Sequence, residues 1–207
     1  MKEELLFILN TYVAIFVIVD PFAMVPMYLT MTERFSREDR RATRRKATVV
    51  ALAILFSFTI SGSRIFTFFG ITMPAFQIAG GILLLMFGLS QLNRKRKRLG
   101  DGEEEEGMSK DDISIFPLAT PLLAGPGAIS TVVLFSSNST SSIRVASLMF
   151  SILLVLSSAY FLLKLAPTVY RILGRTGLNV ITRIMGIIVT AIAVQFIING
   201  VKGAFNI

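Results

Sequence analysis

Long apolar runs, separated by short blocks that hold most of the charge, constrain this chain more than any other feature. A helix needs about 20 mainly apolar residues to cross the roughly 30 Å hydrocarbon core of a bilayer. Six segments reach or approach that length: 5–31, 47–63, 71–92, 113–136, 145–166 and 180–201. The pattern predicts an all-α integral membrane protein with six transmembrane helices.

The positions of Lys and Arg predict how these helices are oriented. Sixteen of them lie in the first, third and fifth connections, and four lie on the opposite side of the predicted membrane. Positive residues accumulate in cytoplasmic loops, so both termini are expected outside a cell (inner or plasma) membrane. The formal net charge of +8 has the same origin. Basic residues that flank apolar spans argue against a nucleic-acid partner and indicate contact with lipids.

Several residue types on which enzymes depend are absent from the chain. There is no Cys and no His, which excludes disulfides, thiolate nucleophiles, His-based acid–base chemistry and the usual zinc ligands. An aspartyl dyad would need a second buried acid, and a Ser–Lys pair would have to use Lys164 at a membrane edge. We therefore expect neither an enzyme nor a metal site or cofactor, apart from a coupling proton or sodium ion.

A shift of the sequence by 105 residues superimposes the predicted spans without a gap. Span one falls on span four, two on five and three on six, and Gly81 falls on Gly186. Because each half holds an odd number of spans, the halves must enter the membrane in opposite orientations. The sequence thus predicts inverted three-helix repeats at 1–98 and 113–207, an architecture that recurs in transporters. An acidic cytoplasmic linker at 99–112, with Glu at 103–106, joins them.

Proline and glycine interrupt spans one and four at matching positions. Asp20-Pro21 in span one falls on Gly125-Pro126 in span four. Proline has no amide donor and clashes with the preceding turn, so both spans should be discontinuous. Simple kinks would explain one such helix, whereas a matched pair is the best sequence indication of a transporter's binding site.

The residues around the two breaks form the predicted substrate site. In each break an N-cap residue precedes a proline at the first helical position, so a half-helix begins there with free amides that suit a carboxylate. Carbonyls at the end of the preceding half-helices suit an ammonium group or a coupling cation. The predicted substrate-binding residues are Asp20, Pro21, Phe22, Ala23, Thr120, Gly125, Pro126, Gly127, Ala128, Ser130 and Thr131.

Asp20 is the only carboxylate predicted deep within a span. Buried acids in membranes are costly and usually functional, so Asp20 is expected to receive a substrate ammonium, bind a coupling ion or carry a proton. The alternatives are that it only caps its half-helix or pairs with Arg183. The amides Gln77, Gln91 and Gln195 are interpreted mainly as contacts between helices.

These two breaks resemble the motifs of the MarC family. The run Asp20-Pro21-Phe22-Ala23-Met24-Val25-Pro26 is similar to its first-span motif, and the run 117–128 to its fourth-span motif. The resemblance implies a six-span inner-membrane protein, and some members are described as transporters of glycine and alanine. Members usually have Gly and Asn where this chain has Ala23 and Met24.

The leading hypothesis is a secondary transporter of small neutral amino acids, working by alternating access and driven by a proton or sodium gradient. The alternatives are an exporter of another small solute or drug, and a non-transporting membrane scaffold. A scaffold has no need of an acid beside a helix break. Neutralising Asp20 should therefore leave a scaffold working but impair a transporter. The sequence leaves open whether the chain forms a homo-oligomer.

Overall fold

The computed structural model describes residues 2–92, 114–137, 139 and 141–205. Within these residues the fold is entirely helical. The elements are α1 (Lys2–Val19), α2 (Pro21–Met31), α3 (Arg37–Phe69), α4 (Met73–Leu92), the π-helix η1 (Ser114–Leu123), α6 (Pro126–Ser137), α7 (Ser142–Lys164) and α8 (Ala166–Phe205). The predicted linker at 99–112 lies outside the described residues.

Five stretches are long and apolar enough to cross a membrane. They are Glu3–Met31, Arg37–Gly62, Met73–Leu92, Ser142–Lys164 and Ala166–Phe205, and α6 is a shorter apolar helix. Helices are the expected form, because a lipid-exposed segment must satisfy its backbone hydrogen bonds internally. The chain is therefore all-α with several helices able to span a membrane, as predicted.

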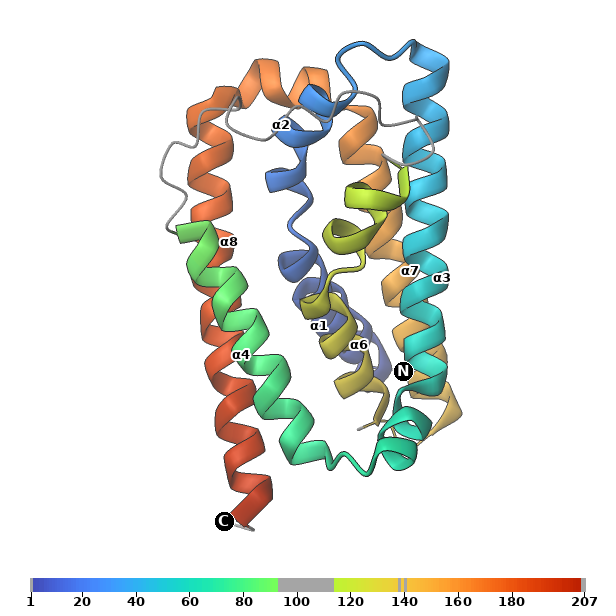
Figure 1. Ribbon diagram of the computed structural model, residues 1–207, viewed down its shortest axis with the longest axis vertical. Coiled ribbons are helices and arrows are strands. Elements are labelled where there is room, and N and C mark those ends of the chain that lie inside the picture. The colour runs from blue at the N-terminus through green and yellow to red at the C-terminus, as the bar shows by residue number, and fades with distance from the viewer. Residues whose placement is uncertain (1, 93–113, 138, 140, 206–207) are drawn as a thin grey trace.

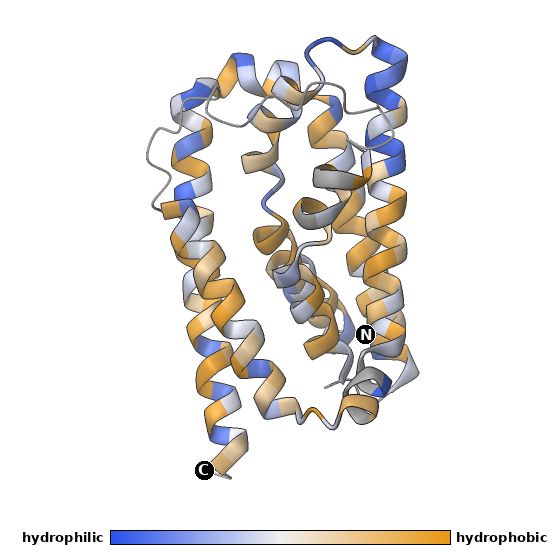
Figure 2. Cartoon of the chain, viewed as in Figure 1, coloured by the Kyte–Doolittle hydropathy of each residue, from blue (hydrophilic) through white to orange (hydrophobic). Residues whose placement is uncertain are grey.

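The helices form an upright bundle with two chemically different ends (Figure 1). The connections α2–α3 and α7–α8 lie at the upper end, which we call the basic end because Arg34, Arg37, Arg41 and Arg45 are exposed there. The α3–α4 connection and both termini lie toward the lower end, which we call the terminal end. Apolar residues cover most of the length between them (Figure 2).

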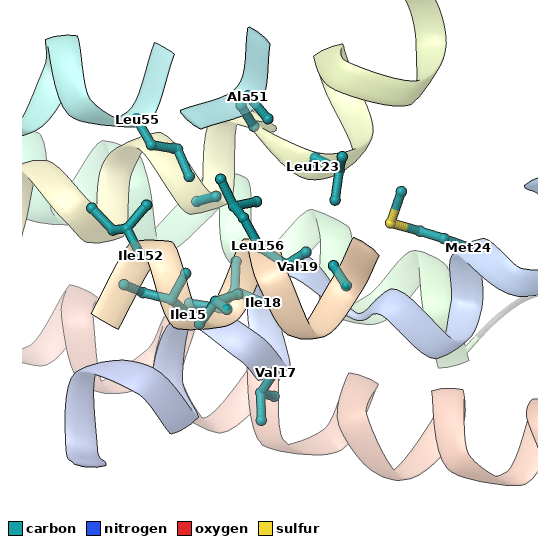
Figure 3. Packing of buried hydrophobic residues seen from close by; sticks show 14 of the residues in the cluster. Ile15, Val17, Ile18, Val19, Met24, Ala51, Leu55, Leu123, Ile152 and Leu156 are labelled. Atoms are coloured by element: carbon teal, nitrogen blue, oxygen red, sulfur yellow. The ribbon is translucent and has the colours of Figure 1, made fainter. Parts of the chain in front are cut away.

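One group of helices surrounds the apolar core. Helix α1 packs on α7, and α3 packs on η1, α6 and α7. Buried side chains from these elements meet in the centre of the bundle, including Ile15, Leu55, Leu123, Ile152 and Leu156 (Figure 3). The packing explains why the two interrupted rods, α1–α2 and η1–α6, are held inside the bundle.

Helices α4 and α8 form a second group, with the most extensive contact between any two elements of the described residues. Glycine makes this contact close: a Cβ at Gly81 would lie 2.8 Å from the carbonyl oxygen of Ala193, and one at Gly88 would lie 3.0 Å from that of Gly186. Small residues at helix interfaces let backbones approach in this way. We call these two helices the α4–α8 pair; α2 packs on its α8 and α6 on its α4.

Two helices extend further than the apolar pattern predicts. Helix α3 begins at Arg37, ten residues before the predicted span, where Ser36 Oγ accepts a 3.1 Å hydrogen bond from the amide of Asp39 as a cap. Helix α8 begins at Ala166 and bends at Gly174, whose φ of 61° and ψ of −176° are not helical. The stretch before Gly174 crosses the basic end, where a connection was expected (Figure 1).

Candidate functional site

The first break separates α1 from α2 at Asp20. Its backbone is left-handed, with φ 42° and ψ 66°, and Pro21 is the first residue of α2. Asp20 Oδ1 accepts a 3.2 Å hydrogen bond from the amide of Ala23, which makes Asp20 the N-cap, as predicted. Asp20 is only 1% exposed. Acidic residues are almost never fully buried unless other groups pair with them.

An amide from the α4–α8 pair contacts the other oxygen of this carboxylate. In the amide orientation that matches donors with acceptors, Nε2 of Gln91 donates to Asp20 Oδ2 at 2.8 Å and to the carbonyl oxygen of Thr182 at 2.9 Å. Gln91 lies in the last turn of α4 and Thr182 in α8. A buried polar bridge therefore connects the first break to both helices of the pair.

The second break separates η1 from α6. Residues 114–123 form a π-helix, and the amide of Ala124 donates to the carbonyl oxygen of Ala119, five residues earlier, at 2.8 Å. The π-form is rare in proteins and occurs frequently at functional sites. Helix α6 then begins at Pro126, as predicted, and the amide of Ile129 donates to the carbonyl oxygen of Gly125 at 2.9 Å.

A small pocket of about 120 Å³ lies beside the second break. A cavity of this size has room for a solute of a few heavy atoms. Its lining combines Gly125, Pro126, Gly127 and Ala128 with apolar side chains of Ile18, Leu83, Phe87 and Leu122. The pocket thus lies where α4 faces the first turn of α6, with α1 alongside.

Close packing joins the two breaks next to this pocket. A Cβ at Gly127 would lie 2.7 Å from Leu84 Cδ2 and 3.2 Å from Ile18 Cγ2. Ile18 stands two residues before Asp20, so the end of α1 contacts the start of α6. Asp20 itself lies outside the pocket lining and is directed to Gln91.

The hydroxyls predicted to contact a substrate serve helix geometry in this conformation. Thr131 Oγ1 donates to the carbonyl oxygen of Gly127 at 2.8 Å, and Thr120 Oγ1 to that of Ile115 at 3.2 Å. Ser130 is buried against Gly80 of α4. Of the remaining predicted residues, Pro21 is buried, and Phe22 and Ala23 are half-buried in the first turn of α2.

Two larger pockets flank the interrupted η1–α6 rod. One of about 430 Å³ at the basic end is lined by α3 residues, among them Arg45 and Lys46, and by Ser114 of η1. Another of about 330 Å³, toward the terminal end, has an apolar lining that includes Ile129 and Val133 of α6. Hollows therefore accompany this rod on both sides of its break.

Cation-binding groups around the breaks are sparse. No cluster of three or more acidic side chains capable of holding a metal occurs among the described residues. A monovalent ion or proton would have to use the Asp20 carboxylate together with backbone carbonyls. The arrangement thus offers a small pocket at one break and a single buried carboxylate at the other.

The sequence interpretation missed the specific role of Gln91. Three glutamines lie in apolar spans, and only structure distinguishes the buried Gln91 from Gln195, which is exposed and pairs with Asn199. The sequence carried no signal for this contact, because Gln91 stands at the end of its predicted span while Asp20 is predicted deep within the first.

Comparison with known proteins gives matches along nearly the whole chain. The family model described as "MarC family integral membrane protein" matches residues 5–205. A UPF0056 membrane protein of Methanocaldococcus jannaschii is 39% identical over 202 residues, covering 97% of this chain and 98% of the relative. One of Aquifex aeolicus is 39% identical (98% and 95% covered), and YvbG of Bacillus subtilis is 35% identical (97% of each). No solved structure matches.

Proposed function

This chain belongs to the MarC family of integral membrane proteins, and from that premise we propose that it is a secondary transporter of small neutral amino acids of the glycine and alanine class. The observation that carries the proposal is the pair of helix breaks packed against each other, with a small pocket at one and a buried carboxylate at the other. Interrupted helices at membrane depth are tolerated where they line a cavity or lie inside protein.

The chemistry of the second break suits the carboxylate of an amino acid. The first amides of α6 have no partner within the helix and carry a partial positive charge. Gly125 and Gly127 have no side chain to keep a ligand from this backbone, and both line the pocket. The surrounding Ile18, Leu83 and Phe87 leave room for a hydrogen or methyl side chain rather than a long polar one.

Asp20 is the group we assign to energy coupling or to the substrate ammonium. Its carboxylate bonds the α2 amide of Ala23 and the side chain of Gln91. A proton or sodium ion that bound this carboxylate would compete with the Gln91 amide. Binding of the ion or proton would then be coupled to the contact between the first break and the α4–α8 pair, because loading Asp20 would weaken its hydrogen bond to Gln91.

We also propose six spans arranged as two inverted three-helix repeats, with the basic end in the cytoplasm of a cell membrane. The contacts of the α4–α8 pair support the repeat. Gly81 faces Ala193 while Gly88 faces Gly186, and a shift of 105 residues carries Gly81 onto Gly186 and Gly88 onto Ala193. Such reciprocal contacts are what a pseudo-two-fold axis between the halves would produce.

The experiment is uptake of labelled glycine and alanine into proteoliposomes under an imposed proton or sodium gradient, comparing the natural protein with Asp20→Asn. Asparagine is as good an N-cap as aspartate, so α2 should still begin there. We expect gradient-driven uptake by the natural protein and its loss in the variant, with unchanged chromatographic behaviour in detergent.

The other outcomes lead to different conclusions. Uptake that survives Asp20→Asn would keep the transporter and reduce Asp20 to a cap. Absence of uptake by folded natural protein, for both amino acids and both gradients, would contradict the proposed substrate class and favour the scaffold alternative.

A further inference from the structure

A buried arginine near the basic end lacks an anionic partner among the described residues. Arg44, in the second turn of α3, is only 9% exposed. Its Nη1 donates to the hydroxyl of Tyr28 on α2 at 2.8 Å, the only hydrogen bond of this side chain to the described part of the chain. Charged groups are rarely buried unless they are paired, so Arg44 calls for a further partner.

Aromatic rings hold the guanidinium in place on two sides. Its Cζ lies 5.9 Å from the ring centroid of Tyr28 and 5.6 Å from that of Tyr160 on α7. The hydroxyl of Tyr28 in turn donates to the carbonyl oxygen of Arg40 at 3.1 Å. Arg44 is therefore fixed between α2, α3 and α7, and its orientation is set before any ligand arrives.

The edge of the guanidinium that remains unused is the one that binds carboxylates. Nε is buried and has no hydrogen-bond partner, and Nη2 makes no hydrogen bond to any described residue. The parallel N–H bonds of Nε and Nη2 form the fork that pairs with both oxygens of a carboxylate. Lysine has no equivalent planar fork.

A second orphan donor lies one turn deeper on the same face of α3. The hydroxyl of Thr48 is buried and has no hydrogen-bond partner among the described residues. Other threonines of this protein, such as Thr59, Thr131 and Thr190, donate to the carbonyl four residues earlier, which is the usual arrangement in a helix. Residues four apart on a helix are neighbours, so Thr48 and Arg44 lie on the same face of α3.

From this cluster we infer a carboxylate-binding site at Arg44 and Thr48, enclosed by Tyr28 and Tyr160, that takes a small solute from the basic end of the bundle. The site is separate from the two helix breaks and does not depend on the proposed transport. Arg44 would hold the carboxylate bidentately, and the Thr48 hydroxyl would donate a third hydrogen bond.

The test is titration of the purified protein in detergent with sodium acetate at neutral pH and constant ionic strength, with no gradient present. Two of the four Tyr lie at Arg44 and the chain has no Trp, so a change at these rings alters a large share of the tyrosine fluorescence, and calorimetry gives a second measure. We expect saturable acetate binding by the natural protein, weakened about tenfold in Arg44→Lys and severalfold in Thr48→Val. Arg45→Lys, an exposed neighbour on α3, is the matched control and should bind acetate normally.

Each contrary outcome would overturn the inference. No saturable acetate response by the natural protein would mean that water alone satisfies Arg44. Equal losses in Arg44→Lys and Arg45→Lys would indicate a general charge effect, and stronger binding of inorganic phosphate than of acetate would contradict the carboxylate assignment. Thr48→Val removes only an unpaired hydroxyl, so it keeps the test decisive if Arg44→Lys fails to fold. Because binding is measured without transport, its failure is distinguishable from failure of the proposed function.

Discussion

Among single residues, Asp20 and Gln91 show how two side chains from different helices form one buried polar contact. Asp20 alone would cap α2, and Gln91 alone would be an amide at the end of an apolar helix. Together they make a hydrogen bond of 2.8 Å that ties the first break to the α4–α8 pair. A hydrogen bond to a charged group contributes more than a neutral one, and one inside a bundle is costly to leave unmade.

Replacing Gln91 with leucine should therefore destabilise the protein. The change leaves the carboxylate of Asp20 and the carbonyl of Thr182 without this donor, at a cost of about 2 kcal/mol. For a chain of this size that lowers the unfolding midpoint by roughly 4–8 °C, measurable by circular dichroism in detergent. Gln195→Leu is the control, since that amide is exposed and should leave the midpoint nearly unchanged. Equal shifts in both variants would show that the bridge contributes nothing.

Among elements, the contact between α4 and α8 depends on the absence of side chains. At Gly81 a Cβ would meet Ile197 Cγ1 at 2.7 Å and the Ala193 carbonyl oxygen at 2.8 Å. A side-chain atom can move aside, whereas a backbone carbonyl in a packed helix cannot. The close approach of α4 and α8 therefore requires glycine at individual positions such as Gly81.

Gly81→Ala should separate the pair and cost about 1–3 kcal/mol, the usual price of overpacking. Gly177→Ala in α8 is the matched control, because its Cβ would meet only side-chain atoms of Leu173 on the same helix. Alanine favours a helix over glycine by up to about 1 kcal/mol, so the control should be neutral or stabilising. Thermal unfolding of both variants measures the difference, and a Gly81→Ala protein as stable as the control would contradict the packing described above.

Hydropathy and helix-breaking residues predict most of these elements but not their side-chain contacts. Apolar length predicts the rods, and Asp20-Pro21 and Gly125-Pro126 predict both breaks, because proline acts on its own backbone. The π-form of η1 has no such local signal. Arg44 falls in the first of the predicted basic connections, because a charge block by itself does not reveal that α3 begins at Arg37 and carries one of its arginines inward. Burial of this kind depends on Tyr28 and Tyr160, which are distant in sequence.

For the molecule as a whole, the packing divides the described helices into two bodies. The α4–α8 pair is one, and the remaining helices around the core in Figure 3 are the other. Contacts between the bodies fall largely on α2 and α6, the half-helices that begin at the two breaks. The Asp20–Gln91 bridge and the small pocket also lie between the bodies. Movement of the pair against the rest would thus open and close the candidate site, as alternating access requires.

A disulfide between the bodies should then stop transport, while one inside a body should not. The natural chain has no Cys, so introduced pairs are unambiguous. A Cβ at Gly80 of α4 would lie 3.0 Å from the Cβ of Ser130 of α6, which is shorter than the roughly 3.5–4.5 Å of a disulfide. A small outward shift of α4 would therefore let Gly80→Cys with Ser130→Cys form a cross-link between the two bodies. Thr11→Cys with Ser151→Cys joins α1 to α7 within one body, where the natural hydroxyls are 2.7 Å apart.

We expect oxidation to abolish amino acid uptake by the first variant, reduction to restore it, and the second variant to transport in both states. Uptake by the oxidised first variant, with the cross-link verified by mass spectrometry, would mean that the pair does not move against α6 during transport.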